Sequence, residues 1–404
     1  MKNRQPEDQP SAVPETATQE GEVRARWAWT EPSVWNERML TALEKGVKGG
    51  KWFSLIDKVY ARANLEAAAD KVIANHGSAG VDRQTVEVFA GRKQTEVERL
   101  SEELAAGTYQ PQGILRTYIP KPGSSEKRPL GIPTLRDRTA QGALRNVLEP
   151  IFEQDFAEHS YGFRPKRSCR DALRRVDALL EKGHHYVVDA DLKSYFDTIP
   201  HNRLMARIEE KISDGRVLNL IRSYLKQRVM DALKDWTPEA GTPQGAVISP
   251  LLSNIYLDSL DHQMAEQGYE MTRYADDFVI QCQSLEEAEQ ALAMVREWVA
   301  QAGLQLHPEK TKIVDAAQRG GFDFLGYHFE RGKKWPRRKS MTKFREAIRK
   351  ETKRNHGKCL NAIIARLNPK LRGWFGYFKH SGQQTFKDVD GWVRGRLRSI
   401  LRRR

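Results

Sequence analysis

The sequence predicts an α+β fold in several domains, followed by a basic helical region. Three observations support this prediction. The chain has 404 residues and 39% hydrophobic content, enough to bury more than one core. Long stretches with apolar residues at helical spacing are interrupted by a few short β-rich runs. Residues 333–404 carry 23 Lys and Arg against 4 Asp and Glu, an excess larger than the net charge of +14 of the whole chain.

The N-terminal part is predicted to be helical after a disordered start. Residues 1–25 are rich in Pro, Glu and Gln, a composition typical of disordered segments. Residues 26–110 are then predicted to form a helical extension that leads into the next domain. Apolar residues recur at helical spacing in three stretches, 36–61, 65–77 and 86–109, and the last ends near Gly107.

Residues 111–330 mix strands and helices. Two short strands around a Pro, Gly and Ser turn predict a hairpin over 115–134. Further β-rich runs are 185–192, 273–280 and a strand pair within 310–330. Helical patterns cover 138–156, 168–183, 201–212, 215–229, 241–264 (after a Gly and Pro turn) and 284–303.

The C-terminal residues 331–404 are predicted to be a folded, helical, polyanion-binding domain. Their positive charge suits a nucleic acid partner. Aromatic residues interleaved with the charges suit stacking on bases and argue against a disordered arm: Trp335, Trp374, Phe375, Tyr377, Phe378 and Trp392. A basic face that only aids solubility is the alternative, and core packing is the better explanation for Trp374 and Tyr377, which lie at helical spacing.

Several classes of protein are not indicated. The sequence has no apolar run long enough to span a bilayer and no targeting signal at its start, so we expect a cytoplasmic protein without a membrane partner. The three cysteines, Cys169, Cys282 and Cys359, are isolated, which argues against a disulfide framework or a structural zinc site.

Acidic residues beside apolar strands indicate a metal site. The run "RYADDFVI" places Asp276 and Asp277 in a stretch otherwise suited to a buried strand, and "VVDADL" ends in Asp191. Carboxylates crowded in an apolar frame repel one another unless a cation of high charge density neutralises them, and Mg²⁺ prefers such oxygen ligands. Two such ions serve phosphoryl transfer. The alternative, a solvated turn, is made less favourable by the apolar flank Phe278–Ile280.

Seven blocks carry a resemblance to a known family. In chain order they are "KRPLGIPTLRDRTAQGAL", "SYGFRPKRS", "DADLKSYFDTI", "GTPQGAVISPLLSNIYLD", "RYADDFVI", "HPEKTKI" and "FDFLGYHF". The chain resembles bacterial group II intron-encoded reverse transcriptases over residues 50–330, and "LNPKLRGWFGYFKHSG" looks like their maturase segment. The resemblance implies a right-hand polymerase, with fingers and an antiparallel-sheet palm in 111–330 and a helical thumb in 331–404.

The resemblance also assigns catalytic and metal-binding roles. Asp191, Asp276 and Asp277, with the carbonyl of Leu192, would hold two Mg²⁺ ions. The implied reaction is attack of a DNA primer 3′-hydroxyl on the α-phosphate of a dNTP, directed by an RNA template.

Five residues match dNTP-binding positions of the family: Lys121, Arg128, Phe196, Gln244 and Lys312. Phe196 would exclude a 2′-hydroxyl by contact, although a plain core role fits its residue type equally well. The block "HPEKTKI" contains both Lys310 and Lys312, and which of them approaches the primer or pyrophosphate is left open. Gln244 also fits a turn that only caps a helix.

The implied partners are the intron RNA, a DNA primer and target, and dNTPs, and a homodimer is left open. Candidate RNA-binding residues are Arg164, Lys166, Arg372 and Lys379. The resemblance implies a maturase that assists splicing and mobility, in a short form without an HNH endonuclease. The alternatives are a cofactor for splicing alone and a reverse transcriptase recruited to a defence system.

Overall fold

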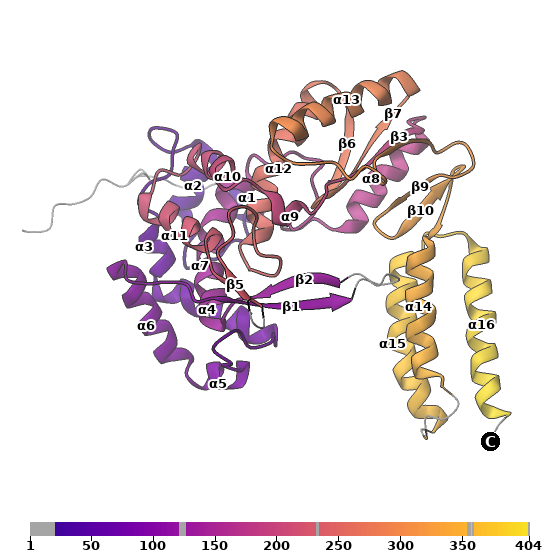
Figure 1. Cartoon of the computed structure of the whole chain (residues 1–404), viewed down its shortest axis with the longest axis horizontal. Coiled ribbons are helices and arrows are strands. Elements are labelled where there is room, and N and C mark those ends of the chain that lie inside the picture. Colours follow the sequence, from indigo (N-terminus) through magenta and orange to yellow (C-terminus); the bar gives the residue numbers. More distant parts are fainter. Residues whose placement is uncertain (1–20, 121–126, 232–233, 354–356, 358, 403–404) are drawn as a thin grey trace, which may run out of the picture.

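The computed structural model describes residues 21–120, 127–231, 234–353, 357 and 359–402 (Figure 1). Residues 1–20 of the predicted disordered segment lie outside this range. Residues Gly21–Arg26 form a short helix, α1, so the predicted disorder does not hold for residues 21–25.

The N-terminal region is helical, as the sequence predicts, but its helices are shorter. The helices are α2 (Glu37–Lys45), α3 (Ile56–Tyr60), α4 (Arg62–Ala74), α5 (Val86–Gly91) and α6 (Lys93–Ala106). Asn36 caps α2 by accepting a hydrogen bond from the Met39 amide. Gly107 ends α6 in the left-handed conformation, with φ of 73°. The pattern over 36–61 is broken after Lys45, because glycines there leave the helical conformation.

The predicted hairpin is confirmed and belongs to a larger sheet. Strand β1 (Ile114–Pro120) pairs antiparallel with β2 (Lys127–Ile132). On its other side β1 pairs in parallel with β4 (Val229–Asp231), which pairs with β5 (Lys234–Trp236). Strands β4 and β5 are not predicted by the sequence, because three-residue strands show no periodicity. Helix α7 (Leu135–Glu153) follows this sheet-forming hairpin in sequence.

The central sheet has the order β6-β7-β3-β8 with all neighbours antiparallel. Its strands are β3 (Tyr186–Asp191), β6 (Glu270–Tyr274), β7 (Asp277–Cys282) and β8 (Lys312–Asp315). The helices of this region are α8 (Cys169–Glu181), α9 (Tyr195–Thr198), α10 (His201–Glu209), α11 (Gly215–Leu225), α12 (Ser249–Glu266) and α13 (Leu285–Gln301).

Alternate residues of the central sheet enter two different cores. Val188 and Ile280 join the large core that includes α12 and α13. Val187 and Val279 face the opposite way and pack with α8 and the next sheet. That sheet consists of β9 (Phe322–Phe324), β10 (Tyr327–Glu330) and β11 (Lys333–Pro336). The sheet is therefore covered on both faces.

Three long helices follow, as the basic helical region predicts: α14 (Arg338–Glu351), α15 (Leu360–Phe378) and α16 (Gln383–Leu401). They share a small core of their own, formed by Phe344, Ile348, Ile363, Leu367, Val389, Val393 and Ile400. We call this unit the thumb bundle. Tyr377 and Phe378 join it to β10, where the Tyr327 hydroxyl donates to the Tyr377 carbonyl at 2.7 Å. In the described part of the chain, no helix combines the length and apolarity needed to cross a bilayer.

Candidate active site

The central sheet brings the three predicted acids together. Asp191 ends β3 and stands directly opposite Asp277, the first residue of β7. Residues directly opposite each other in an antiparallel pair have Cβ atoms about 4.5–5.5 Å apart. Asp276 lies in the two-residue turn that joins β6 to β7, next to Asp277.

Asp189 is a fourth acid, which is not among the residues predicted from the sequence. It lies two residues before Asp191 and therefore on the same face of β3 as Asp191 and Asp277. Burial, opposed by Lys312 and reinforced by neighbouring acids, raises the pKa of Asp189 to about 6. Burial and the charges of Asp189, Asp276 and Asp191 raise the pKa of Asp277 to about 7. The alternation "DAD" in a strand was the signal that could have found it.

The acids fit a hard divalent cation. The pKa of Asp276 is raised first by burial and also by Asp191, while Arg128 and Arg273 lower it. Among the described residues, no three His, Cys, Asp or Glu side chains are arranged so that they could together bind a metal ion. Carboxylates that raise one another's pKa are nevertheless suitable ligands, because Mg²⁺ prefers oxygen ligands and would neutralise their negative charges.

One of the clustered acids, Asp191, forms an ion pair with a lysine. The Lys310 ammonium donates to Asp191 Oδ2 at 2.5 Å, so Asp191 attracts a cation in this structure. Lys312, by contrast, is exposed on β8 opposite Asp189. The Asp191 carbonyl accepts from the His307 amide at 2.7 Å, and the following Leu192 is buried.

Phe196 and Gln244 line the same cavity, of about 560 Å³. Their neighbourhood is fixed by the backbone, because the Thr242 amide donates to the Phe196 carbonyl at 2.7 Å. Gln244 Nε2 donates to Asp197 Oδ2 at 3.3 Å. Arg116 also lines the cavity with its guanidinium 5.3 Å from the Trp236 ring, and no sequence signal marked it.

The predicted phosphate-binding cations lie on the β1–β2 hairpin. Arg128 is exposed on β2, and its charge acts on Asp276, whose pKa it lowers. Lys121 lies outside the described residues.

The placement of Arg164 argues against the predicted RNA contact. Its side chain is only 2% exposed and pairs with Glu153 at 2.8 Å. Its Nη1 group also donates to the Ser160 carbonyl at 2.8 Å. Because the hydrogen-bond donors of this guanidinium are already satisfied inside the protein, they are not free to bind a phosphate. We therefore correct this prediction to a structural role. Lys166 is exposed and donates to the carbonyls of Ala25 and Arg26, at 3.2 and 3.1 Å.

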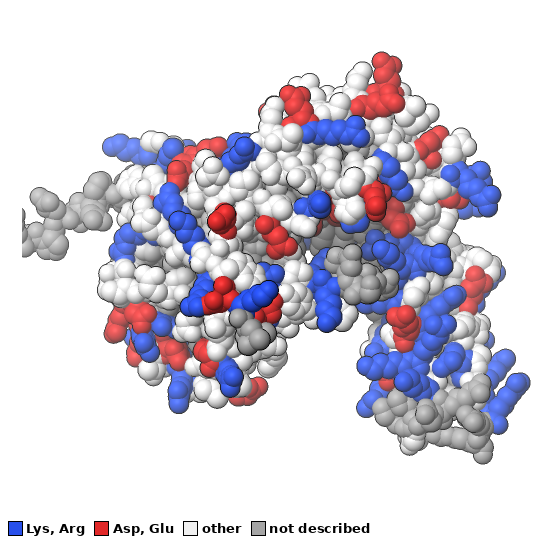
Figure 2. All heavy atoms as spheres, viewed as in Figure 1, with Lys and Arg blue, Asp and Glu red and all other residues white. Residues whose placement is uncertain are grey.

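The two other predicted RNA-binding residues are exposed. Arg372 lies on α15 and Lys379 directly after it. Lys379 also borders a cavity of about 220 Å³ between α8, β10 and the end of α15. Figure 2 shows Lys and Arg side chains crowded over the thumb bundle, whereas acids are more frequent elsewhere on this face. Trp374 stacks on Phe344 with centroids 4.4 Å apart, which confirms the core role expected for this ring.

An antiparallel sheet that ends in clustered acids, a β-hairpin bearing cations and a helical basic bundle together define a right-hand, template-directed polymerase. The chain belongs to the reverse transcriptase family. Residues 119–329 match the family described as "Reverse transcriptase (RNA-dependent DNA polymerase)". Residues 341–404 match "Group II intron, maturase-specific domain". The protein is thus an RNA-directed DNA polymerase joined to a maturase domain, and enzymes of this class use divalent metal ions.

The chain is also similar to individual known proteins and to a solved structure. Protein YkfC of Escherichia coli is 32% identical over 381 residues, covering 84% of this chain and 94% of YkfC. The group II intron-encoded protein LtrA of Lactococcus lactis is 39% identical over 196 residues, or 48% of this chain and 32% of LtrA. A solved structure, "Partial Cas6-RT-Cas1--Cas2 complex", covers 61% of this chain and 41% of its own at 25% identity, with a TM-score of 0.38.

Proposed function

We propose that this protein extends a DNA primer on group II intron RNA with dNTPs by two-metal phosphoryl transfer, and that it binds the same RNA to assist splicing and mobility. The observation that carries the proposal is the placement of Asp191 opposite Asp277, with Asp276 in the adjoining turn, at the end of the central sheet.

Asp191, Asp276, Asp277 and the Leu192 carbonyl would hold two Mg²⁺ ions. When bound, these ions would activate the primer 3′-hydroxyl and stabilise the oxygen that leaves. The rigid sheet register supports this role, because it fixes Asp191 and Asp277 on one face. In the reaction, an oxygen–phosphorus bond forms between the primer and the α-phosphate, and the bond to pyrophosphate breaks.

The cavity that holds Phe196 and Gln244 would receive the sugar of the incoming nucleotide. Phe196 would contact the 2′ position and so disfavour rNTPs, while Gln244 would contact the nucleotide through its amide. Arg128 and Lys121, from the hairpin, would bind the triphosphate, and either Lys310 or Lys312 would approach pyrophosphate. The positive charge of Arg128 lowers the pKa of Asp276, and this proximity to the acids supports the triphosphate-binding role proposed for Arg128.

The thumb bundle would bind the RNA. Its exposed cations, among them Arg372 and Lys379, suit contact with phosphates, and Lys166 would extend this surface. Because the three helices of the bundle have a core of their own, RNA binding and chemistry would reside largely in different parts of the chain.

The test is extension of a DNA primer on an RNA template with Mg²⁺, comparing the wild type with Asp276→Ala and dNTPs with rNTPs. Extension by the wild type with dNTPs only would support the proposal. In parallel, the intron RNA is incubated with and without protein and its splicing is followed. Folded wild-type protein that binds RNA and promotes splicing without extending a primer would favour a cofactor for splicing alone.

A further inference from the structure

The turn that presents Asp276 has an unfavourable backbone conformation. Ala275 has φ of +61°, in the left-handed region that residues with a Cβ atom seldom occupy. The residue is also only 5% exposed, so water does not supply its hydrogen bonds freely. Something in the surrounding structure must therefore hold this turn in place.

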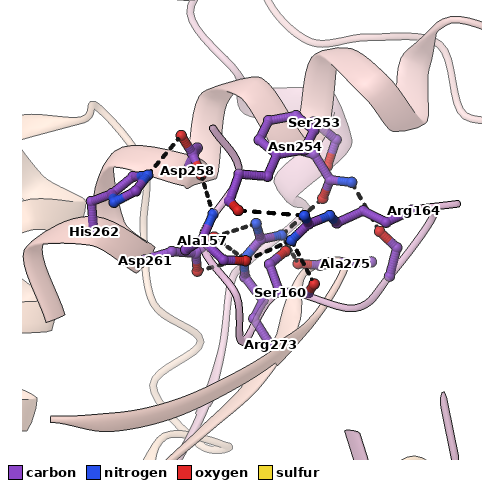
Figure 3. A network of polar contacts seen from close by, with 12 residues as sticks. Ala157, Ser160, Arg164, Ser253, Asn254, Asp258, Asp261, His262, Arg273 and Ala275 are labelled. Carbon is purple, nitrogen blue, oxygen red and sulfur yellow. Dashed lines mark hydrogen bonds and ion pairs between the residues drawn. The ribbon is translucent and has the colours of Figure 1, made fainter. Parts of the chain in front are cut away.

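A buried guanidinium meets this requirement. Arg273 is 0% exposed, and its Nη1 group donates to the Ala275 carbonyl at 2.9 Å and to Asn254 Oδ1 at 2.9 Å (Figure 3). Its Nε group donates to Asp261 Oδ1 at 2.7 Å. Asn254 and Asp261 are seven residues apart on α12, two turns on one face, so a single helix positions the guanidinium.

The same network also contacts the turn at Ala275 through a second segment, which contains Gly162. Asn254 Nδ2 donates to the Gly162 carbonyl at 2.8 Å. A Cβ atom on Gly162 would lie 2.2 Å from the Ala275 amide nitrogen, so this glycine permits direct contact with the turn. The segment is also tied to β6, because the Tyr161 amide donates to the Arg273 carbonyl at 2.9 Å. Arg273 thus binds the Ala275 carbonyl, while Gly162 packs against the Ala275 amide nitrogen.

We propose that Arg273 and Asn254 are positioning residues of the polymerase reaction, which fix the Ala275 backbone so that Asp276 and Asp277 keep the geometry that the metal ions need. The inference rests on the proposed metal-binding role of these acids. The planar fork of arginine is essential, because it reaches Asp261, Asn254 and Ala275 at once, whereas a lysine amine cannot.

Arg273→Lys tests this role, because the lysine keeps a positive charge beside Asp261 but lacks the planar fork. We expect kcat for primer extension to fall at least tenfold, with KM for dNTP and affinity for RNA changed less than twofold. Mn²⁺ binding, followed by electron paramagnetic resonance on a complex with dideoxy-terminated primer and RNA template, is expected to weaken at least tenfold. Asn254→Ser, which keeps a small polar side chain, is expected to change kcat and Mn²⁺ binding in the same direction, and it substitutes if Arg273→Lys does not fold.

Gln281→Met is the matched control. Gln281 is a buried polar residue of β7 whose Nε2 donates to the Val176 carbonyl at 3.0 Å, away from the turn. We expect it to lower thermal stability without changing Mn²⁺ binding. Unchanged kcat and Mn²⁺ binding in Arg273→Lys, or an equal loss in Gln281→Met, would overturn the inference. Because the Mn²⁺ measurement needs no turnover, a wild type that binds Mn²⁺ but extends no primer would count against the proposed function alone.

Discussion

The Lys310 ammonium lies 2.5 Å from Asp191 Oδ2, whereas Lys312 stands opposite Asp189 in the register of β3 and β8. The two lysines of one sequence block therefore meet different acids. Lys310 occupies a carboxylate that we propose as a metal ligand, so the ion pair and the metal compete for the same oxygen.

The first prediction concerns this competition. Lys310→Met is expected to lower the Mg²⁺ concentration needed for half-maximal extension about two- to threefold, because an exposed ion pair contributes only about 0.2–1 kcal/mol. The side chains of Lys310 and Asp191 are 60% and 31% exposed, which keeps the effect small. The measurement is a Mg²⁺ titration of primer extension. Lys312→Met is expected instead to raise KM for dNTP, and an unchanged Mg²⁺ midpoint in Lys310→Met would argue against competition.

The second prediction separates chemistry from RNA binding. Asp276→Ala is expected to reduce extension at least about a thousandfold, since loss of a metal ligand removes several kcal/mol of transition-state stabilisation. Affinity for intron RNA, measured by filter binding, is expected to stay within about twofold, because the thumb bundle is untouched. Loss of RNA affinity in this variant would show that the two functions share a surface.

The third prediction concerns the choice of sugar. Phe196→Ala is expected to reduce discrimination against rNTPs by about ten- to a hundredfold, the range that a steric contact in a pocket provides. The measurement is kcat/KM for dNTP and the matching rNTP. Tyr195→Phe is the control: the Tyr195 hydroxyl donates to the Ser253 carbonyl at 2.8 Å inside the core, so its loss is expected to affect stability only. Equal discrimination in Phe196→Ala and the wild type would reduce Phe196 to a core residue.

The fourth prediction contrasts two arginines. Arg164→Ala is expected to destabilise the protein by about 3–5 kcal/mol, because Glu153 would be left without its buried partner. Arg372→Ala is expected to leave stability unchanged but to weaken RNA binding and reduce the salt dependence by about one unit of slope. Thermal melting and RNA titrations at several salt concentrations measure both. A stable Arg164→Ala with weakened RNA binding would restore the role predicted from sequence.

The fifth prediction tests the close contact behind the catalytic turn. Gly162→Ala is expected to be strongly destabilising or inactive, since its Cβ atom would meet the Ala275 backbone at 2.2 Å. Gly391→Ala, in an open part of helix α16, is expected to be neutral or to stabilise by up to about 1 kcal/mol. Normal activity and melting temperature in Gly162→Ala would show that the two segments can separate freely.

These contrasts show what sequence alone could predict. That Asp191, Asp276 and Asp277 lie together could be predicted because acids at the ends of apolar strands stand out, and the hairpin could be predicted because its turn is rich in Pro, Gly and Ser. Arg164 was misassigned because local charge says nothing of burial, and its partner Glu153 lies 11 residues earlier on another element. The support from Arg273 could not be predicted either, since it depends on how helix α12 lies against β6.

The thumb bundle is attached to the rest of the molecule near one end, through Tyr377 and Phe378, while its own core holds the three helices together. Helix α15 has 19 residues, so the bundle extends about 28 Å from this attachment, and a rotation of about 10° there would move its far end by about 5 Å. The bundle is therefore long compared with the region that attaches it. A change in how Tyr377 and Phe378 pack against β10 would therefore displace the far end of the bundle more than any other part of it.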